Sequence, residues 1–139
     1  MKVLYISLIT LLLASCGGPK ETTITIQPDG NQMKYATTSF TVEANQKVTL
    51  VMDNTATNPV MKHNIVLLKD ASKINEVGQK ALSTPDYIPD MPTIIAAPAM
   101  ANAGEKTEVT FTAPAEPGKY VFICTYPGHY MMMQGEMIV

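Results

Sequence analysis

The 139 residues suffice for one domain with a sizeable core and are too few for two. Ten basic and twelve acidic side chains give a formal net charge of -2, so the chain lacks the basic footprint of a protein that binds nucleic acid. Nucleic-acid partners are therefore excluded.

The first segment in chain order has the features of an export signal. Lys2 precedes an apolar run over residues 3–14 that is too short to span a bilayer. The run ends in "LLASCGG", where small residues before Cys16 resemble the bacterial lipobox. This resemblance implies a signal peptide over 1–15, a lipid on Cys16 and a tether over 16–21, which would hold the protein on the extracytoplasmic side of a bacterial membrane. An ordinary cleaved signal peptide is the alternative.

From residue 22 onward, seven short segments alternate apolar and polar residues and are rich in β-branched and aromatic side chains. They are 22–27, 39–44, 47–53, 63–68, 106–112, 118–124 and 135–139, separated by Asn, Pro and Gly. The pattern predicts one all-β domain over 22–139, an antiparallel Greek-key sandwich.

The block 69–105 departs from this pattern and predicts an excursion across the outside of the sandwich. Residues 72–82 have the spacing of a short helix, although Gly78 inside it costs about 1 kcal/mol relative to alanine. The apolar face of this helix would contain Ile74, Val77, Ala81 and Leu82. Prolines leave room for regular structure afterwards only near 93–96.

Soft-donor side chains crowd into the last eighteen residues, "FICTYPGHYMMMQGEMIV". Cys124 ends a predicted strand, His129 follows after a Pro-Gly turn, and Met133 comes four residues later. If Cys16 carries a lipid, Cys124 has no disulfide partner, and a free thiol in an oxidising compartment needs another role. The other histidine, His63, opens the segment 63–68 and could connect the loop to the body of the fold.

Two imidazoles, one thiolate and a weak thioether are the ligands of a blue-copper electron-transfer centre, so these four residues predict a site for one copper ion. Met131 and Met132 offer the same thioether as Met133, but the spacing to Gly135 favours Met133.

Zinc could occupy the same Cys-His-His set. Cys124 and His129 could also form a nucleophile and its base. Because no third residue to orient them is visible, we predict that the protein is not an enzyme.

The motifs "CTYPGHYMMMQGEMIV" and "MKHNIVLL" resemble the ligand loop and the upstream His-Asn strand of azurin and auracyanin blue copper proteins, the cupredoxins. The resemblance covers roughly 48–139 and implies that His63, Cys124 and His129 are equatorial ligands and Met133 the axial one. It also implies that Asn64 ties its strand to the loop and that the N–H groups of Asn64 and Tyr126 donate to the cysteine sulfur.

The chain departs from azurins in two ways that the resemblance makes visible. Azurins carry glycine where Lys62 stands, which leaves a fifth contact to the copper open. Azurins also have a disulfide near the N-terminus that this chain lacks, so the chain resembles auracyanins more than azurins.

The function expected from these observations is transfer of single electrons between extracytoplasmic redox proteins. An apolar patch around a partly exposed His129 would dock these partners transiently. Its predicted members are Met61, Pro127, Tyr130, Met131 and Met132. Copper storage or delivery through the same Cys/His/Met cluster is the alternative.

Overall fold

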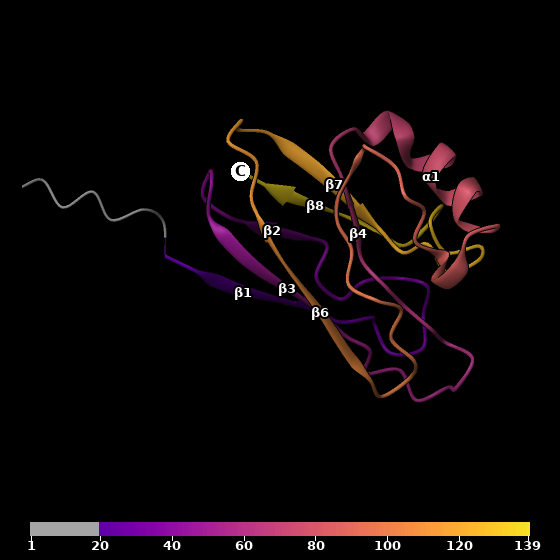
Figure 1. Ribbon diagram of the computed structural model, residues 1–139. Helices are drawn as coiled ribbons and strands as arrows, with labels where there is room; N and C mark the ends of the chain where they lie inside the picture. Colours follow the sequence, from indigo (N-terminus) through magenta and orange to yellow (C-terminus); the bar gives the residue numbers. More distant parts are fainter. Residues whose placement is uncertain (1–19) are drawn as a thin grey trace, which may run out of the picture.

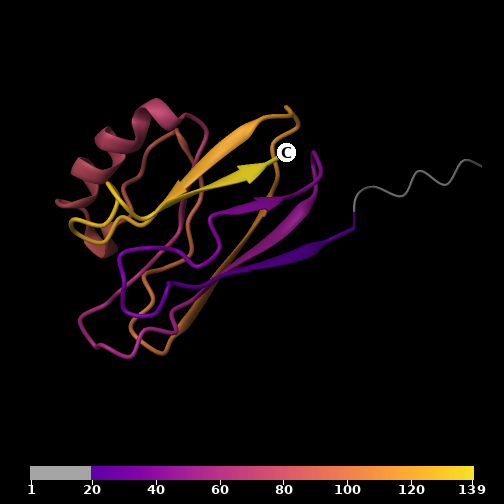
Figure 2. The same ribbon diagram turned by 180° about the vertical axis from the view of Figure 1, so that it is seen from behind.

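The computed structural model describes residues 20–139, which form two β-sheets (Figures 1 and 2). In spatial order the smaller sheet contains β1 (Thr22–Ile26), β3 (Lys47–Asp53) and β6 (Lys106–Thr112). The larger contains β2 (Ser39–Thr41), β8 (Gln134–Ile138), β7 (Lys119–Ile123), β4 (Val66–Leu68) and β5 (Ile94–Ala96). The predicted all-β Greek-key sandwich is confirmed. The expected signal peptide and Cys16 lie outside the described residues.

The hydrophobic core lies between the two sheets because successive side chains of a strand point to opposite faces. Along β3, Val48, Leu50 and Met52 are fully buried while their neighbours are not. They share one core cluster with Leu67, Phe122 and Met137 of the larger sheet. The alternation seen in the sequence is therefore the signature of strands buried on one face.

Two strand pairs are parallel, so the expectation of a wholly antiparallel sandwich is wrong. β1 pairs in parallel with β3, and β2 pairs in parallel with β8. Between β1 and β3 the chain crosses to the other sheet to form β2, so it enters β3 from the same end as it entered β1. Residue alternation sets which face of a strand is buried and carries no information on strand direction.

The excursion contains a 3-10 turn η1 (Ala71–Lys73), the helix α1 (Ile74–Ala81) and a second 3-10 turn η2 (Pro85–Tyr87). Val77 of α1 packs with Val66, Leu68 and Ile123, so the helix covers the outer face of the larger sheet (Figure 1). Leu82, predicted on the buried face, follows the helix and is 56% exposed. In the part of the chain that the structure describes, no helix is long and apolar enough to cross a bilayer.

Close packing explains why a glycine, Gly78, stands inside the helix α1. It is buried, and a Cβ at this position would overlap the ring of Tyr130, which also belongs to the cluster under α1. Tyr130 lies in the turn after His129, so this contact seats the proposed ligand loop against the helix. The cost of glycine in a helix is thus offset by a close approach that no larger residue permits.

The substitution Gly78→Ala tests this contact. Helix propensity alone predicts stabilisation by about 1 kcal/mol. We expect instead a net loss of about 1–3 kcal/mol in the free energy of unfolding, because the new methyl group must displace the Tyr130 ring near its base. Urea unfolding measures the change. In a Tyr130→Ala background the same substitution should cost less or stabilise, whereas stabilisation in the wild-type background would contradict the proposed clash.

Candidate metal centre

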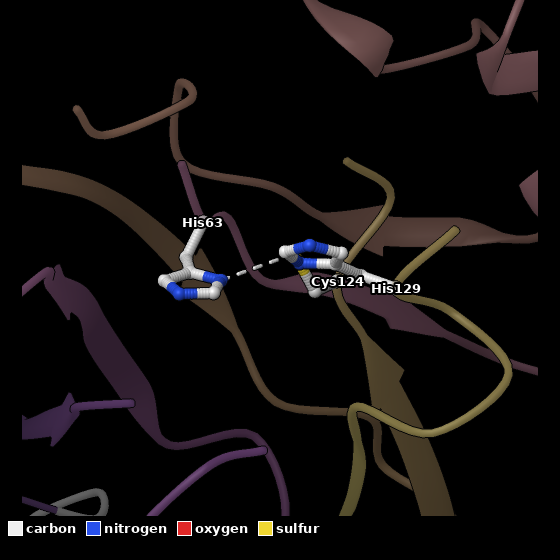
Figure 3. Close-up of side chains that lie close together, drawn as sticks. All are labelled: His63, Cys124 and His129. Atoms are coloured by element: carbon white, nitrogen blue, oxygen red, sulfur yellow. Dashed lines mark hydrogen bonds between the residues drawn. The ribbon is translucent and has the colours of Figure 1, made fainter. Parts of the chain in front are cut away.

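Three side chains that can ligate a metal meet inside the fold. The Cys124 sulfur lies 3.8 Å from Nδ1 of His63 and 3.6 Å from Nδ1 of His129 (Figure 3). The ligand atoms of the three residues all lie within 4.8 Å of one another. His63 and Cys124 are fully buried, and His129 is only 4% exposed. The predicted convergence of these residues is confirmed.

A backbone bridge, and not a regular strand, holds His63. The strand expected over 63–68 begins only at Val66. Upstream of it, the His63 N–H donates to the Ala101 carbonyl at 3.1 Å, and the Ala101 N–H donates back at 2.9 Å. The buried Asn54 amide also donates to the carbonyls of Ala101 and Met61. These hydrogen bonds hold the backbone that carries the imidazole, although the residue stands outside the strand.

Cys124 and His129 belong to one hydrogen-bonded loop that closes at Met133. The Cys124 N–H donates to the Met133 carbonyl at 3.0 Å, and the Met133 N–H donates to the His129 carbonyl at 2.8 Å. Gly128 has a φ of +83°, which lets the turn before His129 form without strain. The short spacing therefore brings these side chains together by local geometry.

The side chain of Asn64 joins the His63 segment to the ligand loop. Its Oδ1 accepts from the Thr125 N–H and its Nδ2 donates to the Thr125 Oγ1, both at 2.8 Å. Thr125 Oγ1 in turn donates to the carbonyl of Tyr87 at 2.5 Å. Tyr87 and Asp86 both have positive φ, so this bond also restrains a strained turn. Three segments distant in sequence are held at one point.

Sequence reasoning missed Thr125 and Tyr35, both of which support the site. Tyr35 is fully buried, and its hydroxyl donates to the Asn64 carbonyl at 2.6 Å. Thr125 could have been suspected because it directly follows Cys124. Tyr35 gave no such signal, since it lies in a loop 29 positions from its partner.

Of the three consecutive methionines, only Met133 lies inside the fold. It is fully buried and belongs to the same core cluster as Cys124. Met131 and Met132 are 64% and 60% exposed. The location of Met133 is compatible with a ligand, and its axial role stays a prediction.

Burial keeps the Cys124 thiol protonated when no metal is bound. It raises the pKa of this thiol to about 11, although hydrogen bonds from the backbone N–H groups of Asn64 and Tyr126 oppose the shift. Binding of a metal must therefore displace the thiol proton, and the two N–H donors then stabilise the thiolate.

The two imidazoles are neutral at pH 7, which is the form that binds metals. Burial lowers the pKa of His63 to about 4, with a smaller contribution from the nearby His129, whose own pKa burial also lowers. Within residues 20–139, Nε2 of His63 is a buried polar atom without a hydrogen-bond partner, so a positive charge there would lack a counter-group. These donors fit copper, and zinc as well.

Residues 22–139 match the family model "Copper binding proteins, plastocyanin/azurin family". The chain is 36% identical to Auracyanin-A of Chloroflexus aurantiacus, over 100% of this chain and 95% of that protein. It is 33% identical to Azurin of Pseudomonas aeruginosa, over 98% of this chain and 96% of that protein. The solved structure of auracyanin A, described as a "blue" copper protein, superimposes with a TM-score of 0.79 at 40% identity and covers 86% of this chain and 98% of that one.

We expect acid to destabilise the metal-free protein. His63 has a pKa of about 4 when folded and an ordinary pKa near 6.5 when unfolded, so between these values only the unfolded state gains a proton. The contribution of His63 to the free energy of unfolding is fully present above pH 6.5. It falls as the pH drops toward 4, by about 2 kcal/mol at pH 5 relative to pH 7.5.

Urea unfolding of the metal-free protein across this pH range measures how steeply the free energy of unfolding changes with pH. The variant His63→Gln removes the titrating group and should reduce this slope. Part of the slope remains because the pKa of His129 shifts in the same direction. Equal slopes in the two proteins would contradict the assignment to His63.

Proposed function

The chain belongs to the plastocyanin/azurin family of copper-binding proteins, and on that premise we propose that it carries single electrons between extracytoplasmic redox proteins while tethered to a membrane by a lipid. The observation that supports this most directly is the buried set of two imidazoles and one thiol within 4.8 Å. In this family one copper ion is the cofactor, and we propose that His63, Cys124 and His129 hold it here, with Met133 as the axial ligand.

Bound copper supplies a one-electron couple between Cu(I) and Cu(II). The protein contributes a frame for the donors, because the Asn64–Thr125 hydrogen bonds and the His63–Ala101 bridge hold the backbone segments that carry His63 and Cys124. A mixture of sulfur and nitrogen donors lies between the preferences of the two oxidation states. Small rearrangement of these ligands would favour fast electron transfer.

Electrons would enter and leave near His129. This residue, which we expected to be partly exposed, keeps only 4% of its surface accessible. Of the five residues predicted for the docking patch, Pro127, Met131 and Met132 are exposed, whereas Met61 and Tyr130 are half-buried. Tyr130 is also held against Gly78. The exposed members offer a small adaptable apolar surface suited to transient partners.

The burial of the cluster argues against the two other functions considered. A storage or delivery protein must release its metal, but His63 and Cys124 are fully buried and braced by neighbouring segments. A thiol nucleophile must be exposed and ionised, yet the Cys124 thiol is fully buried and its pKa is raised. We therefore propose that the protein has no enzymatic activity.

A lipid on Cys16 would account for the apolar leader and for Cys124 having no second cysteine to pair with. In a bacterial host, the full-length protein should sediment with membranes, and Cys16→Ser should shift it to the soluble fraction or leave its leader uncleaved. Mass spectrometry of the purified protein should show a diacylated N-terminal cysteine. An unmodified N-terminus elsewhere in the chain would favour the ordinary signal peptide.

Visible and EPR spectra of the copper-loaded protein test the electron-transfer function. Oxidised protein should absorb intensely through charge transfer from the Cys124 thiolate to copper, and Cys124→Ser should abolish this absorption. Met133→Leu should keep the colour and change the reduction potential, because it removes only a weak ligand. A colourless oxidised copper protein would instead support copper storage or delivery.

Met131→Leu is the control for the axial ligand, and Met131→Glu tests the docking patch. Met131→Leu should leave both colour and potential unchanged, and a shift in potential here would mean that the axial ligand is misassigned. Met131→Glu should leave the spectrum unchanged and slow electron self-exchange between two copies about tenfold, because it places charge on the docking patch. An unchanged exchange rate would exclude Met131 from the docking surface.

A further inference from the structure

Three methionines from separate segments line one surface hollow of about 580 Å³. Met33 and Met132 are 39% and 60% exposed, and Met61 is half-buried. The remaining lining residues are Asn31, Gln32 and Lys34. The hollow is therefore lined by three side chains that carry a thioether, beside otherwise polar side chains.

The loop that carries Met33 is fixed to the loop before Met61 by one side chain. Asn31 Oδ1 accepts from the backbone N–H groups of Thr57 and Asn58, both at 2.9 Å. Asn31 Nδ2 donates to the Thr57 hydroxyl at 3.0 Å. The two loops are thus joined by three hydrogen bonds.

The backbones of the other two methionines are also restrained. Met61 donates its N–H to Asn58 at 3.0 Å, and its carbonyl accepts from the buried Asn54 at 2.8 Å. Met132 donates its N–H to the carbonyl of His129 at 3.0 Å. Because a methionine side chain has three rotatable bonds, its sulfur can still adjust to a common ligand above this fixed frame.

We propose that Met33, Met61 and Met132 bind one Cu(I) ion at the surface, at a site separate from the buried centre. Thioethers are uncharged soft donors that select Cu(I) over the hard cations present in solution. The positive charge of Lys34 in the hollow is offset by Asp29, whose carboxylate lies 3.4 Å from the ammonium group. An apolar docking surface alone would not need sulfur in all three segments, nor polar side chains between them.

The position of this site relates it to the buried ligands. Met61 precedes His63 by two residues, and Met132 directly precedes Met133. An ion captured at the surface would therefore be held by the same two segments that carry His63 and Met133. The proposal does not depend on electron transfer by the buried centre, since it concerns only a second binding event.

The experiment uses the protein with its buried centre already filled by copper and kept reduced without oxygen. All methionine methyl groups are labelled with ¹³C, and one further equivalent of Cu(I) is added as its acetonitrile complex. We expect the methyl resonances of Met33, Met61 and Met132 to shift together. The resonance of Met131, exposed but outside the hollow, should not move.

Competition with a chromogenic Cu(I) chelator measures the affinity of the added ion. Met33→Leu, Met61→Leu and Met132→Leu should each weaken binding about tenfold, whereas Met131→Leu should leave it unchanged. An unchanged visible spectrum after reoxidation would show that each variant retains its buried centre. The proposal is overturned if the methyl groups do not respond to one equivalent, or if Met131→Leu weakens binding as much as the other three substitutions.

Discussion

The reciprocal hydrogen bonds between Asn64 and Thr125 are the constraint on which the centre depends. His63 and Cys124 are 61 positions apart, and each directly precedes one member of this pair. The two bonds are buried, so breaking them would leave polar groups unpaired inside the core. Thr125 extends the same link to the carbonyl of Tyr87, and Tyr35 donates to the carbonyl of Asn64. The backbone segments that carry His63 and Cys124 are therefore joined by bonds between protein groups.

The chain uses methionine in two different environments next to each other. Met133 is buried in the same core cluster as Cys124, whereas Met131 and Met132, two residues and one residue earlier, are exposed to solvent. Between His129 and these methionines, Tyr130 packs against Gly78 of α1. The rigid interior suits a centre whose ligands must not move, and the adaptable thioethers outside suit transient contacts.

Several features followed from the sequence because they are local. The spacing of Cys124, His129 and Met133 within one short loop restricts how far apart their side chains can lie, and alternation predicted the strands 47–53 and 106–112 with their observed bounds. Other expectations were wrong where a distant partner decides. Two strand pairs are parallel, β4 begins only at Val66, and Leu82 is exposed.

The amino-acid sequence by itself restricted the possible donors, because the chain has only two histidines and two cysteines, and Cys16 stands in the segment that resembles a lipobox. It also determined the all-β class and the short helical insertion. Only the tertiary structure decided that His63 reaches the sulfur, that Gly78 makes room for Tyr130, and that Met33, Met61 and Met132 line one hollow. Periodicity records the environment of each residue along its own segment, whereas these contacts arise from side chains of segments far apart in sequence.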